Sequence, residues 1–313
     1  MKVSAMTKKR AVTFKPYIKT RYAYEKLRVC RHCQHFTVLW EEECAHCGKA
    51  TLISIRQRAT SKVKRTMVNQ RLIAFLIGLI GIYFGQTSLQ MILCAAAVIL
   101  LIALLWFLQN RMLPSEVPLE MERIFEEEQP QILEDLKYNR KTAVAALKED
   151  ELLTYVMLRE ISTLVHNDKI RLQQVVLLQS FVLRKDMDLV VEPLLIKSFD
   201  TDLAAYIGEV AKVQRDLIKN SSIRYILTYE SHILQMGNGM DILSSVAGAA
   251  IRLQKYVEAY PEFIRRYARH IPKDRFLRLY RMIQQHPNAS WGSLANEVAL
   301  IRQEQYEWDS DFQ

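Results

Sequence analysis

The longest hydrophobic pattern in the chain runs from Leu72 to Leu108, 37 residues without one charged side chain. A single helix of that length would measure about 55 Å, nearly twice the roughly 30 Å hydrocarbon core of a bilayer. The uncharged polar stretch Gly85–Ser88 near its middle has the composition of a turn. The pattern therefore predicts a transmembrane helical hairpin over 72–108, with spans near 68–85 and 89–108. Its apolar length favours this over a helical hairpin buried in a soluble core.

After the hairpin, residues 114–313 show apolar positions at helical spacing, with no extended alternation of the β type. Caps, glycines and prolines divide them into about eight to ten helices. One of these helices is expected to begin at Asp186 and to contain Glu192 and Pro193. The fold class predicted for 114–313 is an all-α domain, built as a bundle or a solenoid-like array, without a repeat of fixed period.

Before the hairpin the pattern changes to short β-type runs around four cysteines. Phe36–Leu39 and Thr51–Ile55 read as short strands. The cysteines form two Cys-x-x-Cys pairs separated by ten residues, a spacing typical of a tetrahedral Cys₄ zinc site. A redox motif would need a helix start in a βαβ unit, which is missing here. A disulfide framework is disfavoured if this part of the chain lies in the reducing cytoplasm.

On these residues the stretch 28–56 resembles the zinc-ribbon family in its short form with two Cys-x-x-Cys knuckles. The resemblance implies one structural Zn²⁺ ion held by Cys30, Cys33, Cys44 and Cys47. Four thiolates complete the tetrahedron, so the neighbouring histidines His32, His35 and His46 are not expected to be ligands. The first knuckle departs from the family pattern because it has no glycine, whereas Gly48 follows the second knuckle.

Charge is distributed unevenly along the 313 residues. Residues 1–71 carry 17 Lys and Arg against 4 Asp and Glu, a net charge of +13, whereas residues 72–313 have a net charge of −4. Basic residues flank the hairpin, and the turn between its helices has none. The positive-inside tendency then predicts both termini in the cytoplasm, with the two spans in a bacterial-type inner membrane.

The charge pattern completes a predicted domain order. It consists of a basic N-terminal arm (1–27), the zinc ribbon (28–56), a basic juxtamembrane linker (57–71), the hairpin (72–108) and the helical cytoplasmic domain (114–313).

Two basic groups are candidates for contact with anionic lipid or an anionic partner. The first, beside the membrane, contains Lys62, Lys64, Arg65 and Arg71. Topogenic charge and attraction to lipid head groups explain it, and a nucleic-acid surface is the alternative. The second lies in the helical domain and contains Arg265, Arg266 and Arg269, where solvated faces of amphipathic helices are the simpler explanation.

No catalytic constellation stands out. The chain lacks His-Glu-x-x-His, a phosphate-cradling glycine loop and Gly-x-Ser-x-Gly. Acid and imidazole are close in sequence only at His166–Asp168 and Glu230–His232, which read as helix termini or surface features. The sequence therefore favours a protein that is not an enzyme.

The stretches 234–243 and 263–302 resemble the helical cytoplasmic domain of pilus and type II secretion membrane platforms. This chain lacks the further C-terminal spans of those proteins.

Taken together, the patterns predict a membrane-anchored adaptor or scaffold that binds the lipid bilayer and an unidentified cytoplasmic or membrane protein. A membrane tether for nucleic acid and a platform component of a secretion or pilus-type machine are the alternative functions. Homo-oligomerisation is left open.

Overall fold

Residues 9–14 and 20–312 are described by the computed structural model, and they divide into two units. The ribbon–hairpin unit covers the described part of Ile18–Ala145 together with Thr163–Val165. The helical unit covers Ala146–Ser162, His166–Gln313 and the described residues of Met1–Tyr17. Within the predicted basic arm, residues 1–8 and 15–19 lie outside the described chain. The described chain is mostly helical, with a small β-sheet and two long apolar helices, as the sequence predicts; the sheet has a third, central strand that the sequence analysis did not name.

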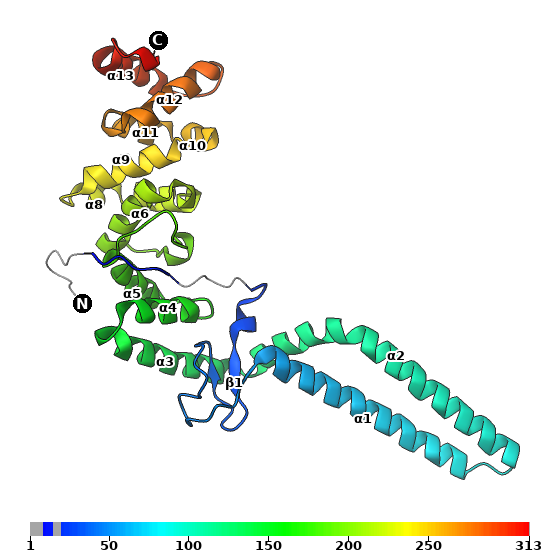
Figure 1. Ribbon diagram of the computed structural model, residues 1–313. Helices are drawn as coiled ribbons and strands as arrows, with labels where there is room; N and C mark the ends of the chain where they lie inside the picture. Colours follow the sequence, from blue (N-terminus) through cyan, green and yellow to red (C-terminus); the bar gives the residue numbers. More distant parts are fainter. Residues whose placement is uncertain (1–8, 15–19, 313) are drawn as a thin grey trace. The chain divides into compact units, whose positions relative to one another are not determined.

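A small antiparallel sheet begins the ribbon–hairpin unit (Figure 1). Strand β1 (Arg28–Cys30) lies between β2 (Phe36–Thr37) and β3 (Leu52–Ser54). The register pairs Val29 with Phe36 on one side and with Ile53 on the other. A 3₁₀ turn, η1 (Ala23–Lys26), precedes the sheet. The strands are as short as the sequence suggests, and β2 ends two residues before the expected Leu39.

Helix α1 (Ile55–Tyr83) follows β3 without a break. Ser54 ends the strand and caps the helix, because its side chain accepts from Gln57 N while the Gln57 side chain accepts from Ser54 N. No glycine or proline occurs between this capping box and Gly78. Residues 57–71, expected as a linker, are therefore part of a helix that joins the ribbon directly to the apolar segment.

Helix α2 (Ser88–Glu127) returns antiparallel to α1 after the predicted turn. It continues through Pro114 and Pro118, and it bends in its part nearer the ribbon (Figure 1). Helices of 29 and 40 residues measure about 43 and 60 Å. Both helices are long and apolar enough to span a membrane.

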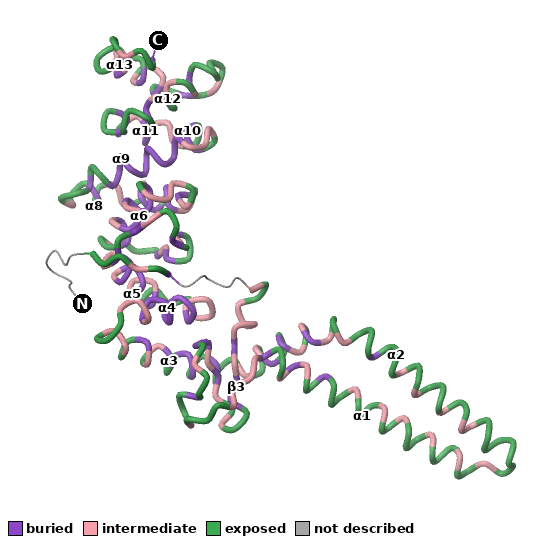
Figure 2. Tube along the Cα trace, in the orientation of Figure 1, coloured by how far each residue is buried: buried purple, intermediate pink, exposed green. Residues whose placement is uncertain are grey.

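The apolar side chains of the hairpin lie on its outside. None of the most apolar window of either helix is buried (Figure 2). The two helices contact each other at Gly78, where an added Cβ would lie 2.5 Å from Val98 Cγ2. Nearer the ribbon, Gln109 Nε2 donates to Gln70 Oε1 at 3.0 Å. Within the apolar part the helices are thus held by close packing and a polar contact, as is common for helices in lipid.

Helix α3 (Gln129–Ala145) completes this unit. Its buried face consists of Ile132, Asp135, Leu136, Asn139 and Ala143, a helical spacing that points all five at the same surface. Two members of this face are polar, and both contact the ribbon.

The helical unit consists of short helices that follow one another in an array (Figure 1), and its most extensive helix pair, α6 (Thr201–Val213) with α9 (Gly239–Ala250), is not adjacent in the sequence. Its core is formed largely by α6 and α9, which contact each other extensively and are buried along most of their length (Figure 2). The elements in chain order are η2 (Ala146–Lys148), α4 (Glu151–Ser162), α5 (Asp168–Gln179), η3 (Glu192–Leu194), α6 (Thr201–Val213), η4 (Arg215–Leu217), α7 (Asn220–Thr228), α8 (Glu230–Leu234), α9 (Gly239–Ala250), α10 (Gln254–Ala259), α11 (Pro261–Tyr267), η5 (Ala268–His270), α12 (Lys273–Gln285), α13 (Leu294–Tyr306) and η6 (Ser310–Phe312).

The prediction of a helix that begins at Asp186 and contains Glu192 and Pro193 is wrong. Residues 183–200 are irregular apart from η3. The Gln214 side chain donates to the carbonyl oxygens of Arg184, Lys185 and Met187, and Tyr206 Oη donates to that of Val190. These side chains satisfy backbone groups that a helix would have paired internally.

The described N-terminal residues 9–14 belong to the helical unit. Arg10 forms a parallel bridge with Phe181, in which Arg10 N donates to Ser180 O and Val182 N donates to Arg10 O. Phe14 is 8% exposed and packs on the rings of Tyr155 and Phe181, at centroid distances of 4.9 and 6.0 Å. The start of the chain is therefore built into a unit whose other residues all follow the hairpin.

Candidate metal centre

The four ribbon cysteines converge on one point. Their sulfur atoms all lie within 4.8 Å of one another. Two of the separations cross between the knuckles, 3.6 Å from Cys30 to Cys47 and 3.5 Å from Cys33 to Cys44. A tetrahedral zinc ion with Zn–S bonds of about 2.3 Å has sulfur–sulfur edges of about 3.8 Å, whereas a disulfide has a bond of about 2.05 Å. The thiols are thus spaced to hold a metal ion.

The two knuckles share one backbone geometry. Gln34 N donates to Cys30 O at 2.9 Å, and Gly48 N donates to Cys44 O at 2.7 Å. Each knuckle closes with a residue at positive φ, Gln34 at 61° and Gly48 at 68°. The glycine that the family pattern leads one to expect in the first knuckle is replaced by a glutamine in the same left-handed conformation.

Hydrogen bonds to sulfur complete each turn. The backbone of His32 and Cys33 donates to Cys30, that of His35 donates to Cys33, and that of Lys49 donates to Cys47. Such donors stabilise thiolate and orient it toward a metal.

The ribbon cysteines differ in pKa: the pKa of Cys30 is lowered, and that of Cys33 is raised. Burial raises the pKa of Cys30, but the Thr51 hydroxyl 3.1 Å away and the backbone donors outweigh burial and lower this pKa to about 6. At Cys33, burial together with the neighbouring sulfurs raises the pKa to about 12. Four crowded sulfurs cannot all ionise without a cation between them, so the donor set fits a divalent metal ion.

A second group of donors lies on the side of the ribbon that contacts α3. His35 Nδ1 lies 2.7 Å from Asp135 Oδ1, and His46 Nε2 lies 3.9 Å from the same oxygen. The two imidazole rings stack at 3.8 Å, and His46 also packs on the Tyr138 ring at 4.2 Å. Burial and the neighbouring His35 lower the pKa of His46, although Asp135 opposes this. His35 and His46, which the sequence analysis treats as bystanders, are therefore brought together by an aspartate 100 residues away.

Asp135 and Asn139 also hold the ribbon by its backbone. Phe36 N donates to Asp135 Oδ2 at 2.8 Å, and Val38 N donates to Asn139 Oδ1 at 3.2 Å. Thr37 Oγ1 donates to the same Asn139 oxygen at 2.8 Å. These bonds satisfy the free edge of β2, so α3 takes the place of a further strand. The sequence signal for this contact is a polar residue at two core-facing positions of an otherwise apolar helix face.

Ion pairs between the base of α1 and the end of α2 strengthen the same region. Arg58 forms a two-pronged pair with Glu128, at 2.8 and 3.1 Å, and its guanidinium lies over the Phe36 ring. Lys62 pairs with Glu120 at 2.7 Å.

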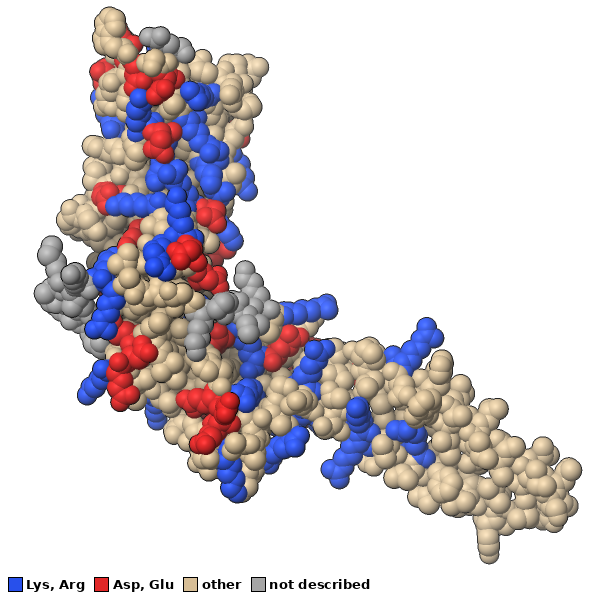
Figure 3. Space-filling model, viewed as in Figure 1, with Lys and Arg blue, Asp and Glu red and all other residues tan. Residues whose placement is uncertain are grey.

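The remaining juxtamembrane candidates are Lys64, Arg65 and Arg71. Lys64 and Arg65 are exposed, and Arg71 Nε donates to Met67 O in its own helix. Figure 3 shows basic side chains projecting from the half of the hairpin nearer the ribbon, while its far half is uncharged.

The second basic group is neutralised within the helical unit. Arg265 pairs with Glu262 at 2.8 Å, Arg266 with Glu230 at 2.7 Å, and Arg269 with Glu297 and Glu304 at 3.0 and 2.6 Å. Acidic and basic side chains accordingly intermix on this unit (Figure 3). Exposed pairs of this kind add little stability, but they reduce the positive field that an anionic partner would meet.

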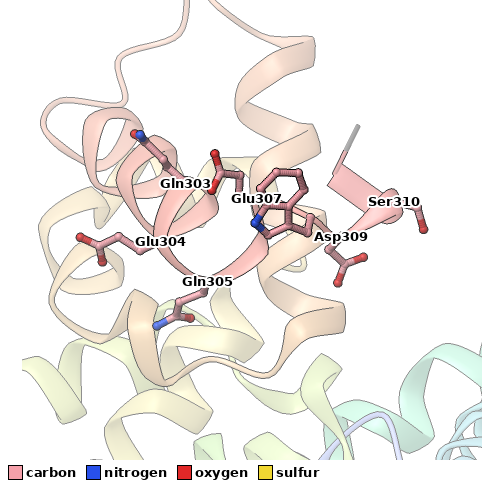
Figure 4. A pocket seen from close by; sticks show the side chains of 7 residues that line it. Gln303, Glu304, Gln305, Glu307, Asp309 and Ser310 are labelled. Atoms are coloured by element: carbon pink, nitrogen blue, oxygen red, sulfur yellow. The ribbon is translucent and has the colours of Figure 1, made fainter.

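A hollow of about 520 Å³ lies at the C-terminal end of the helical unit. Its wall includes Glu304, Asp309 and Trp308, of which Trp308 is 90% exposed. The labelled polar side chains point in different directions and do not converge (Figure 4). Glu304 pairs with Arg269, and Asp309 pairs with Lys273. The hollow thus offers no group of side chains aimed at one reacting atom.

Comparison of the chain with protein-family models, curated proteins and solved structures finds no match.

Proposed function

We propose that this protein is a membrane-anchored adaptor or scaffold. In this proposal the hairpin crosses a bacterial-type inner membrane twice, with both termini in the cytoplasm. The ribbon contains one structural Zn²⁺ ion, and the helical unit binds a protein partner. The protein acts by binding and not by catalysis.

The observation that carries this proposal is that the chain before the hairpin packs on the chain after it, in both units. Arg10 bridges to Phe181, and the ribbon contacts α3 through Asp135 and Asn139. Contacts of this kind require both sides of the hairpin to lie on one face of the membrane, which supports two crossings. Exposed Lys64 and Arg65 beside the apolar segments support the cytoplasmic face.

Support for zinc comes from the donor set. Four thiols spaced for a tetrahedron, with backbone donors directed at sulfur, suit a borderline-soft cation without geometric preference. A closed Cys₄ site has no open coordination position, so the ion would stabilise the ribbon. The ribbon has too few residues to build a core of its own, and metal binding would supply much of its folding free energy.

The ion pairs favour the adaptor over the nucleic-acid tether. Arg58, Lys62 and Lys9 all face carboxylates of this chain, as do the three arginines of the second basic group. Nucleic-acid binding would need those cations free to displace counterions from phosphates.

The test is affinity purification of the tagged full-length protein from native membranes in mild detergent. We expect extraction to require detergent and a defined set of proteins to co-purify. Cys44→Ser should lose the partners that the ribbon holds, and Cys94→Ser, outside the ribbon, should keep them. Recovery of the wild type in the soluble fraction, or purification without any specific protein, would contradict the proposal.

The same preparation separates the alternatives. Association of the full-length protein with DNA or RNA, falling steeply with salt, would favour the nucleic-acid tether. Co-purification of an assembly ATPase would favour the secretion or pilus-type platform.

A further inference from the structure

The group formed by His35, His46 and Asp135 has the composition and spacing of a metal site. Its three donor atoms lie within 4.8 Å of one another. The donors come from three segments: the end of the first knuckle, the inside of the second knuckle, and α3. They are distinct from the four cysteines, which form a separate group.

Distances within the group lie close to those of ligands that share an ion. Metal–nitrogen and metal–oxygen bonds of about 2.0–2.2 Å place neighbouring ligand atoms about 3–3.5 Å apart. The observed separations from Asp135 Oδ1 are 2.7 Å to His35 and 3.9 Å to His46, on either side of that range. To share one ion, the two rings would rotate out of their stacked arrangement, in which they lie 8° from parallel.

The Asp135 carboxylate is buried and held in one orientation, as a metal ligand commonly is. Asp135 is 3% exposed, and its second oxygen accepts from Phe36 N at 2.8 Å. A buried carboxylate is costly unless it is paired or coordinates a metal. The backbone donor also fixes the orientation of the carboxylate, as outer contacts commonly do for metal ligands. Both histidines are partly exposed, which leaves a route for an ion from solvent.

We propose that His35, His46 and Asp135 bind a second divalent transition-metal ion beside the cysteine site. Two imidazoles and one carboxylate suit zinc or another late first-row metal, and water would fill the remaining positions. The neutral His35 imidazole would bind the ion through Nδ1 as its Nε2–H tautomer, so the ring keeps one proton and the ion takes the place of the hydrogen bond to Asp135. The ion would join both knuckles to α3, so that the ribbon and the helix after the hairpin become one cross-linked body.

The test uses the full-length protein in detergent, loaded with Zn²⁺ and passed over a chelating resin that removes weakly held ions. We expect two zinc ions per chain in the wild type and one in His46→Asn and Asp135→Asn. The asparagine at 135 can still accept from Phe36 N, so the ribbon contact is retained. His32→Asn is the matched control, because His32 lies in the first knuckle but outside the group, and it should keep two ions.

Loading with Co²⁺ monitors the two sites separately. The thiolate-to-cobalt charge-transfer band reports the cysteine site and should be unchanged in His46→Asn. One ion in the wild type with that band intact, or two ions retained by His46→Asn, would overturn the second site. Loss of the band in the wild type would instead contradict the cysteine site of the proposed function.

Discussion

The first knuckle should bind metal more tightly if Gln34 is replaced by glycine. Gln34 has a φ of 61°, a left-handed conformation that costs an L-residue about 1–2 kcal/mol. Glycine removes that cost but adds about 0.5–1 kcal/mol of backbone entropy lost on folding. The substitution also removes the exposed hydrogen bond from Gln34 Nε2 to Arg31 O, worth a few tenths of a kcal/mol. The net gain is about 0.5 kcal/mol.

The second knuckle provides the matched control. Gly48 has a φ of 68°, and no atom lies within 4 Å of an added Cβ, so Gly48→Ala changes the backbone preference without a clash. We expect Gly48→Ala to lose about 1 kcal/mol. Because folding of the ribbon is coupled to metal binding, these differences should appear in metal affinity.

The assay is competition for Zn²⁺ between the full-length protein and a chelator of known affinity. The difference of about 1.5 kcal/mol between Gln34→Gly and Gly48→Ala corresponds to about ten-fold in dissociation constant. If Gln34→Gly bound Zn²⁺ more weakly than the wild type, or if the two variants had equal affinity, the reasoning that both knuckles require a left-handed residue would be refuted.

Three further predictions concern contacts made by the ribbon, the N-terminal residues and the hairpin. Asn139→Ala should leave ribbon backbone donors unpaired and cost about 1–3 kcal/mol, visible as faster amide exchange in residues 36–39; unchanged exchange would contradict it. Phe14→Ala should remove about 3–5 kcal/mol of packing and speed exchange at 180–182, and protection equal to wild type would refute that contact. Gly78→Ala should force Val98 away and cost about 1–3 kcal/mol in thermal unfolding in detergent, whereas Gly81→Ala, which has open space, should be near neutral. Equal effects of the two alanines would show that the helices do not pack at Gly78.

Local pattern was sufficient for the features that depend on neighbouring residues. The two Cys-x-x-Cys pairs specify their own turns, and the uncharged run with a polar centre specifies two helices and a turn. Gln34 shows where local pattern was insufficient. The missing glycine suggested a departure from the ribbon geometry, but the backbone at Gln34 adopts that geometry.

Long-range pairing could not be predicted in the same way. The helix expected at Asp186 fails because Gln214, 27 residues or more further on, satisfies the carbonyl groups of that loop. The histidines appeared to have no role because their partner, Asp135, is on the other side of the hairpin. An aspartate at a core-facing position of a predicted helix was the available sequence signal for this contact, but it does not indicate which residues the aspartate contacts.

The position of Phe14 between Tyr155 and Phe181 has a consequence for assembly. Those residues are synthesised after the hairpin, so in the proposed two-span topology residues 9–14 must stay on the side of the membrane where the helical unit later folds. If only one helix of the hairpin crossed the bilayer, the N-terminal residues would be stranded on the opposite face and could not reach their site. Correct insertion would thus become a condition for completing the helical unit, and a fragment shortened at its N-terminus would leave that unit with an exposed aromatic surface.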